Sequence, residues 1–463
     1  MCKIFIPHKI TCWTLVFASL LSCDQFIAID PPRTDLVRNS VFKSETTANA
    51  AMIDVYYSMR NSGFASGSAT SVVLCASLSS DELTFFGIGA SSADQYRQFS
   101  ESNLAPNNFI VSGLWSSLYT TVYKANAIIE GVNVATVLRE EVRKQLLGEA
   151  RFIRALCYFY LTNLWGDVPL VLTTDYSLNN TLPRESQTEI YQQMIGDLTQ
   201  AKNLLPDTYA HSNNERVRPN KGAASALLAR VYLFKQEWVN AETEASFIID
   251  NTYLYGLETD LPLVFRAISR EAIFQLWAQQ FPTERSTFFI AGTGPRYGAL
   301  RPDFVQDFEV DDKRWISWGQ TRVVQGITYY GSQKYFDFST PPLDYSTVLR
   351  VAEQYLIRAE ARAYQDNLIG AVADINMIRR RAGLSDISSD DKAAILDFVF
   401  KERRAEFFLE WGHRWLDLKR TGKVNEVMGE LRSTWNKEDE LYPIPENQII
   451  NNPNVTQNNN PGN

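Results

Sequence analysis

Histidine and cysteine are scarce in this chain. Its 463 residues include only 3 His and 5 Cys, and among the histidines only His211 and His413 lie beyond the first 22 residues. The sequence contains no HExxH, GxSxG, Walker loop or CxxC pair, the short motifs of metalloproteases, serine hydrolases, nucleotide sites and metal or redox sites. These absences exclude the common enzymes that depend on His or Cys. We expect no catalytic residue, no metal ligand and no cofactor.

The glycines provide no nucleotide-binding loop either. Gly292, Gly294 and Gly298 have the wrong spacing for one, Pro295 interrupts them, and they do not open a helix. One catalytic class stays open, a hydrolase with paired carboxylates. The 53 Asp and Glu residues offer many pairs, and the sequence does not reveal how far apart they lie.

An excess of positive charge is missing as well. The chain carries 45 Lys and Arg against 53 Asp and Glu, a formal net charge of −8. A mildly acidic protein does not attract a phosphate backbone, so we exclude nucleic acid as a partner. With 45% hydrophobic and 21% charged residues, the composition is typical of a globular protein, and the length allows a substantial core.

No apolar run is long enough to cross a bilayer, which takes about 20 residues. The longest N-terminal run, 12–21, follows a short positive stretch and is ended by Asp24. This order, with a small residue directly before Cys23, is the pattern of a secretory signal with a lipidation site. We predict a lipoprotein signal peptide over residues 1–22 and a lipid anchor on Cys23, which implies a membrane as partner.

The residues after the predicted cleavage site divide into a tether and a body. Residues 23–43 contain a Pro-Pro pair and no sustained period, so we predict an extended, lipidated tether. Residues 44–463 form the predicted body. We interpret it as a single unit made of an N-terminal segment, 44–255, and a C-terminal segment, 256–463, packed together.

Helical periodicity dominates the body. Within residues 144–165 apolar side chains recur at alternating spacings of three and four, which places them on one face of a helix. The same reasoning predicts helices over 187–205, 221–235, 237–250, 350–365, 367–382 and 389–411. Two close helical pairs, broken near Gln236 and Asp366, are rich in alanine, and small residues allow helices to approach as in stacked tetratricopeptide-like hairpins.

Two stretches interrupt the helical pattern. Residues 61–112 and 257–345 are rich in Gly, Ser or Pro and in aromatics, and the second includes strand-like runs at 272–277 and 322–330. Long irregular insertions on a rigid scaffold are where binding sites usually lie. We therefore predict a mainly α fold, a tetratricopeptide-like helical-hairpin scaffold (an α/α superhelix) with long loop-rich insertions and minor β structure.

The chain is rich in aromatic residues, with 26 Phe, 21 Tyr and 10 Trp. Most must belong to the core, but flat rings in the irregular insertions can stack on sugar rings or on peptide side chains. We predict ligand-binding aromatic residues in these insertions and polar partners beside them. The aromatic candidates are Tyr96, Tyr297, Trp315 and Trp318, and the polar candidates are Asp81, Arg97, Arg296 and Asp312.

A cluster of like charges marks the last long predicted helix. Glu402, Glu406 and Glu410 are spaced four apart, which places them on one helical face, where repulsion costs a few tenths of a kcal/mol per pair unless it is neutralised. Nearby candidates to neutralise them are Arg403, Arg404, His413, Arg414 and Arg420. A catalytic acid pair is one interpretation. We favour a structural ion-pair network, because tryptophans and leucines are interleaved with these charges.

Three long motifs resemble those of the SusD/RagB outer-membrane nutrient-binding lipoproteins. The first covers 148–171, with GEARFIRA and LWGDVPLV, and the second covers 402–422, with ERRAE and EWGHRWLDLKRTG. The third is the ending 442–458, with YPIP, NP and QN, although the final QNNNPG departs from the more usual QNPG followed by an aromatic. Together with Cys23, the motifs span nearly the whole chain in the order of the family.

The resemblance implies four tetratricopeptide-like hairpins with a loop-rich binding face, anchored at the cell surface in an outer membrane. It also implies delivery of captured oligomeric nutrient to a SusC-like TonB-dependent transporter as partner. The motif residues are architectural in this family and transfer no ligand site. Those that match are Arg154, Glu402, Glu406, Glu410, His413, Arg414 and Asp417.

The sequence leaves the ligand open. An oligosaccharide is the leading hypothesis, because aromatic platforms favour glycans. A peptide, as in RagB-like proteins, is the alternative, and a deep charged cavity would favour it. A surface glycoside hydrolase is the alternative from another class, and it would need two carboxylates about 5–10 Å apart in a cleft.

Overall fold

The computed structural model describes residues 41–61, 63–86 and 92–458. The predicted signal peptide, Cys23 and most of the predicted tether lie outside these ranges. The described chain is mainly helical with minor β structure, which confirms the predicted fold class. Within it, no helix combines the length and the apolar character needed to cross a membrane.

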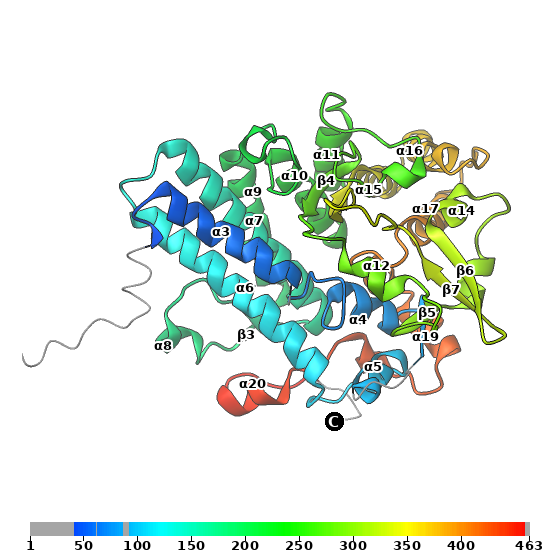
Figure 1. Ribbon diagram of the computed structural model, residues 1–463, viewed down its shortest axis with the longest axis horizontal. Helices are drawn as coiled ribbons and strands as arrows, with labels where there is room; N and C mark the ends of the chain where they lie inside the picture. Colours follow the sequence, from blue (N-terminus) through cyan, green and yellow to red (C-terminus); the bar gives the residue numbers. More distant parts are fainter. Residues whose placement is uncertain (1–40, 62, 87–91, 459–463) are drawn as a thin grey trace, which may run out of the picture.

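Long helices of the first half form one side of the molecule (Figure 1). Two helices of 26 residues, α6 and α7, pack against each other, and α3 and α9 flank them. The bounds in this half are α3 Glu45–Asn61, α4 Val72–Ser79, α5 Ala93–Ser100, α6 Phe109–Val134, α7 Glu140–Trp165, α8 Tyr176–Asn179 and α9 Gln187–Leu204. Helices α4 and α5 lie in the stretch 61–112 that the sequence marks as irregular.

The two predicted alanine-rich hairpins are present. Helix α10 (Lys221–Phe234) pairs with α11 (Trp238–Ile249), and α15 (Val351–Tyr364) pairs with α16 (Leu368–Arg381). Gln236 and Asp366 turn these corners with left-handed φ angles of 59° and 60°. Buried alanines of α10, α11 and α15 share one small cluster, so the hairpins stack closely on each other.

Helix α17 (Lys392–Glu406) is shorter than the predicted helix over 389–411, and this correction matters for the acidic cluster. The chain leaves the helix after Glu406 and turns sharply before α18 (His413–Arg420). Leu409, Trp411 and Gly412 adopt left-handed φ angles of 55°, 44° and 71° in this turn. We call residues 407–412 the corner. Glu410 therefore lies in the corner and not on the helix that carries Glu402 and Glu406.

The remaining helices are short and lie among the strands or near the C-terminal end. They are α12 Thr283–Phe288, α13 Pro302–Gln306, α14 Lys313–Trp318, α19 Val424–Leu431 and α20 Glu446–Asn451. The composition of 441–463 predicts coil, and α20 corrects that prediction for six residues.

Four strands form the largest sheet, with the order β1-β5-β7-β6. Its strands are β1 Leu83–Phe85, β5 Gly298–Leu300, β6 Gly319–Val324 and β7 Ile327–Ser332. All neighbours are antiparallel, and the run 322–330 is a hairpin that turns at Gln325 and Gly326, not one strand. Two small sheets pair β2 (Val168–Pro169) with β3 (Arg184–Glu185), and β4 (Ala272–Leu276) with β8 (Ser346–Arg350).

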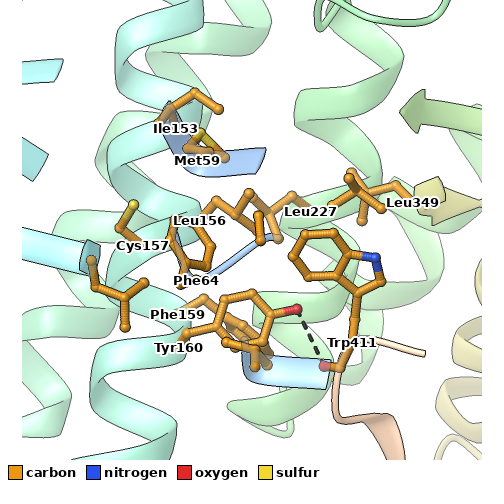
Figure 2. Packing of buried hydrophobic residues seen from close by; sticks show 14 of the residues in the cluster. Met59, Phe64, Ile153, Leu156, Cys157, Phe159, Tyr160, Leu227, Leu349 and Trp411 are labelled. Atoms are coloured by element: carbon orange, nitrogen blue, oxygen red, sulfur yellow. Dashed lines mark hydrogen bonds between the residues drawn. The ribbon is translucent and has the colours of Figure 1, made fainter. Parts of the chain in front are cut away.

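The main hydrophobic core joins residues far apart in the sequence. Figure 2 shows Met59 and Phe64 packed beside Leu156 and Tyr160 of α7, with Trp411 of the corner closing the cluster. The Tyr160 hydroxyl donates to the Trp411 carbonyl oxygen at 3.4 Å. Both cysteines in the described part of the chain, Cys75 and Cys157, are buried free thiols.

Two of the sequence motifs meet at the end of α7. Trp165 donates its indole N–H to the Pro443 carbonyl oxygen at 3.0 Å. Asn458 donates to the carbonyl oxygens of Trp165 and Tyr442, at 2.9 and 2.8 Å. The closing motif therefore fastens the C-terminal segment onto α7.

Candidate functional site

The three glutamates of the acidic cluster are buried and fully ion-paired. Glu402 contacts Arg314 and Arg379, each at 2.7 Å. Glu406 contacts Arg350 at 2.5 Å, and Glu410 contacts both Arg350 and Lys334 at 2.9 and 2.6 Å. These cations come from α14, α16 and the β7–β8 region, so the neutralising partners expected from the neighbouring sequence were wrong. The partners lie 23 to 88 positions away in the chain.

Electrostatics favour a structural role for this cluster. Burial alone would raise the pKa of Glu406, but the guanidiniums of Arg381, Arg350 and Arg314 outweigh burial and hold that pKa far below its usual range. Burial, reinforced by neighbouring arginines, holds the pKa of His413 well below its usual range, so this imidazole is neutral. A general acid needs a raised pKa, and the lowered pKa of Glu406 is the opposite of that.

The other motif residues are also structural. Arg154 of α7 makes two parallel hydrogen bonds to Asp197 of α9, at 2.8 and 2.7 Å, and a third to Asn126 of α6. Asp417 of α18 accepts from Arg403 and Arg420, each at 2.7 Å. Because breaking a buried pair costs about 3–5 kcal/mol, these residues fix how the helices pack.

The two acidic ligand candidates are buried in ion pairs, which corrects their prediction as ligand contacts. Asp81 accepts from Arg414 at 2.7 and 2.8 Å and lies 3.1 Å from Arg404. Asp312 caps α14 and pairs with Arg314 at 2.7 Å. Both carboxylates are engaged by arginines and are almost fully buried, Asp81 at 6% and Asp312 at 3% exposed.

Two of the aromatic candidates are buried as well. Trp318 is 1% exposed, and its indole N–H donates to the Leu261 carbonyl oxygen at 3.0 Å. Tyr96 is 2% exposed and packs beneath Tyr297, with ring centroids 5.1 Å apart. Trp315 is half-buried between Phe308 and Tyr330. Trp318 and Tyr96 are therefore corrected to core residues.

The remaining candidates lie on or near one face of the four-stranded sheet. Tyr297 precedes β5 and its backbone pairs with Phe86, whose N–H donates to the Tyr297 carbonyl oxygen at 3.1 Å. Phe86 packs edge-on against Tyr329 of β7, with centroids 5.3 Å apart. Arg296 lies over Tyr297 at 5.2 Å, and Arg322 is the cross-strand partner of Tyr329. Exposed Arg97 lies on α5, one residue from Tyr96.

We call Phe86, Tyr297, Tyr329, Arg296 and Arg322 the aromatic face. The backbone hydrogen bond between Phe86 and Tyr297 and the ring contact between Phe86 and Tyr329 bring the three rings together. Tyr329 and Arg322 are directly paired, so their side chains point to the same side of the sheet. The rings are half-buried and the two arginines are exposed. Half-buried rings beside hydrogen-bond donors can stack on a sugar ring and bind its hydroxyls.

Three residues of the aromatic face, Phe86, Tyr329 and Arg322, were not among the ligand-binding residues predicted from the sequence. The alternation along β7 was the available signal, because Tyr329 and Tyr330 must point to opposite sides of a strand. Tyr330 points to the side where Trp315 packs, and Tyr329 to the side of Phe86. The sequence alone does not show which of the two sides of β7 the hydrophobic core covers.

A second feature is a groove of about 750 Å³ between α13–α14, α17 and α19, which we call the charged groove. Its aromatic lining is Phe304, Phe308, Phe398 and Phe400. Its charged lining is Asp307, Glu309, Asp312, Asp397, Glu402, Glu426, Arg314, Arg379, Lys401, Arg404, Arg414 and Lys423. Hydrogen bonds from Arg379 and Lys401 lower the pKa of Glu309 and Asp397, so neither carboxyl is a ready proton donor.

Comparison with known proteins identifies the family. A family model described as "Starch-binding associating with outer membrane" matches residues 65–233, and the SusD family model matches residues 312–462. The chain belongs to the SusD/RagB family. This family consists of binding proteins, not catalysts, which confirms the expectation that the chain is not an enzyme.

Curated relatives match over most of the chain. SusD-like protein P2 of Formosa agariphila is 25% identical, over 98% of this chain and 99% of the relative. Starch-binding protein SusD of Bacteroides thetaiotaomicron is 26% identical, over 71% of this chain and 74% of the relative.

Solved structures share the fold. A SusD superfamily protein of Bacteroides vulgatus superposes with a TM-score of 0.78 at 23% identity, covering 90% of this chain and 99% of that one. A laminarin-binding SusD-like protein gives a TM-score of 0.74 at 23% identity, with the same two coverages. Surface glycan-binding protein A of Bacteroides uniformis gives 0.75 at 18% identity, again covering 90% and 99%.

Proposed function

We propose that this protein binds an oligosaccharide at the cell surface through the aromatic face. The observation that carries the proposal is the grouping of three half-buried rings and two exposed arginines on one side of the sheet. Aromatic rings cover the apolar faces of sugar rings at low entropic cost, and guanidinium groups donate to hydroxyls. The similar proteins named above as starch-binding, laminarin-binding and surface glycan-binding support the same ligand class.

The proposal includes an anchor and a partner. Lipidation of Cys23 would hold the body at the outer membrane on the predicted tether, consistent with the family description "associating with outer membrane". A SusC-like TonB-dependent transporter is the proposed recipient of the captured ligand. Pull-down of that transporter with the lipidated protein tests the partnership, and its failure in membranes that contain both proteins would contradict it.

Isothermal titration of the lipid-free body against matched panels tests the ligand class. One panel holds neutral oligosaccharides of several linkages, and the other holds short peptides of equal length with acidic, basic and apolar composition. We expect saturable binding of at least one oligosaccharide and none of the peptides. Binding confined to the peptide panel would contradict the proposal.

The charged groove favours a second candidate function, peptide binding as in RagB-like proteins. A groove of about 750 Å³ is large enough for several residues, and the exposed charges of its lining, Asp307, Glu309, Lys401 and Glu426, offer partners for peptide charges and termini. Lys401→Ala tests this alternative, because that side chain is exposed and its salt bridge is an i,i+4 pair with Asp397 on the same helix. Peptide affinity that falls in this variant and stays constant in Tyr329→Ala would support it.

A further inference from the structure

A smaller hollow lies away from the aromatic face, between α3, the loop 212–218 and the end of β4. Its volume is about 300 Å³, at the lower end of the range for small-ligand sites. Twelve residues line it, from three separate parts of the chain. We call it the α3 hollow.

Large apolar side chains around this hollow are exposed instead of packed. Ile53 and Tyr57 of α3 are 58% and 59% exposed, and Trp277 is 48% exposed. The spacing of four between Ile53 and Tyr57 places them on one side of the helix. The buried residues of α3 are Ala48, Met52, Val55 and Met59, so Ile53 and Tyr57 belong to the opposite side.

The exposed Trp277 is held in place by the paired strands next to it. Trp277 directly follows β4, whose last residue, Leu276, pairs with Ser346 of β8. The next position along the ladder is Tyr345, a buried residue that interacts with both Trp277 and Glu215. The ring of Trp277 is therefore presented by a paired strand, which limits the entropy that a bound ligand would cost.

The loop that forms the opposite wall is also fixed. The Gln275 N–H donates to the Arg216 carbonyl oxygen at 2.8 Å, which ties the loop to β4. Asn213, which adopts a left-handed φ of 55°, is one of the lining residues. Ser212 donates to the Glu215 carbonyl oxygen at 2.6 Å, so the loop is braced internally.

Polar groups complete the lining. Arg60 donates to the Phe281 carbonyl oxygen at 3.0 Å and to Asn61 at 3.2 Å. Arg218 is held by Glu149 at 2.7 Å, and Gln279, two residues after Trp277, is also part of the lining. The hollow thus places exposed rings next to amide, carboxylate and guanidinium groups that both donate and accept hydrogen bonds.

We propose that the α3 hollow is a second carbohydrate site, which takes a single pyranose ring. Trp277 and Tyr57 stack on the apolar faces of the ring, while Asn213, Gln279 and Glu215 bind its hydroxyls. An apolar peptide side chain would leave these amides and the carboxylate without partners, which costs free energy on binding. The inference does not depend on the aromatic face, because the two sites share no residue.

Saturation-transfer NMR with four methyl pyranosides, those of glucose, galactose, mannose and xylose, tests this site. We expect at least one pyranoside to receive saturation from the wild-type protein and from a Tyr297→Ala, Tyr329→Ala variant of the aromatic face. Trp277→Ala, and separately Tyr57→Ala, should lower the affinity about tenfold, because each removes a stacking ring.

Tyr253→Ala is the matched control, since Tyr253 is 85% exposed and does not line the hollow. It should leave the signal unchanged. The proposal is overturned if no pyranoside receives saturation, or if, with the aromatic face already removed by Tyr297→Ala and Tyr329→Ala, neither Trp277→Ala nor Tyr57→Ala lowers the affinity. A signal lost only in the aromatic-face variant would also overturn it, while leaving oligosaccharide binding at that face intact.

Discussion

At the scale of single residues, burial decides what an aromatic or charged side chain does. Trp318 and Tyr329 both follow polar or glycine-rich stretches, yet the first is a core residue and the second lies on the aromatic face. Asp81 and Arg296 differ in the same way, the first buried in an ion pair and the second exposed. The composition of the sequence marks the stretches 61–112 and 257–345, which contain all these residues. Tertiary packing then decides which of their side chains are exposed to a ligand and which are buried in the fold.

Trp318→Ala should destabilise the protein by about 3–5 kcal/mol, because it empties a buried site and removes the hydrogen bond to Leu261. Chemical unfolding measures the loss. Trp315→Ala, at a half-buried ring, should cost less. Equal stability of wild type and Trp318→Ala would contradict the placement of this side chain in the core.

Glu82 makes stability depend on pH. Burial raises the pKa of its carboxyl to about 7, although a hydrogen bond from Ser77 opposes the shift. A carboxyl whose folded pKa exceeds its unfolded pKa contributes stability below about pH 4.5, and this contribution is lost as the pH rises through 7. Glu82→Gln, which mimics the protonated form, should therefore change little at pH 5.

At pH 8 the same Glu82→Gln variant should be more stable than wild type by about 1–3 kcal/mol. Urea unfolding of both proteins at pH 5 and pH 8 gives the comparison. A difference between variant and wild type that is the same at both pH values would show that Glu82 does not titrate in this range.

At the scale of elements, the sequence predicts the bounds of most long helices well, but it does not predict the turn at the corner. Helices α7, α9, α10, α11, α15 and α16 appear within a few residues of their predicted bounds, because each has one continuous apolar face. The corner ends α17 five residues early, although 407–411 continues the helical pattern. Contacts from elsewhere fix it, including the Leu409 N–H, which donates to Glu82 at 3.1 Å.

Gly412→Ala tests how tightly the corner is built. Its φ of +71° disfavours a side chain, and an added Cβ would lie 2.7 Å from the Cβ of Ala76. We expect a loss of about 2–4 kcal/mol in unfolding free energy, from backbone strain together with overpacking. Gly422→Ala is the matched control.

Gly422 has a φ of +72° and nothing within 4 Å of the added Cβ, so only the backbone term of about 1–2 kcal/mol applies to it. Thermal unfolding of both variants separates the two contributions. If Gly412→Ala cost no more than Gly422→Ala, the close approach of the corner to α4 would be refuted.

At the scale of the whole molecule, two motifs that are far apart in the sequence contact each other in the fold. The end of α7 and the closing motif meet through Trp165, Pro443 and Asn458. Sequence reasoning recognised both motifs by resemblance but not their contact, because nothing in a single sequence links positions almost 300 residues apart.

Cys23→Ala should release the protein from the membrane, because the predicted anchor depends on that thiol. Fractionation of cells that express the variant, followed by immunoblotting, measures the change. Cys12→Ala, within the apolar run of the predicted signal, should leave the protein in the membrane fraction. Normal membrane fractionation of Cys23→Ala would contradict lipid anchoring at this residue.

Calorimetric affinities of three proteins test directly whether oligosaccharide binds on the aromatic face. Wild type, Tyr329→Ala and the exposed control Tyr253→Ala are titrated with the oligosaccharide that wild type binds best. We expect Tyr329→Ala to weaken binding about tenfold while melting like wild type, and Tyr253→Ala to bind normally. Unchanged affinity in a folded Tyr329→Ala, Tyr297→Ala double variant would contradict it.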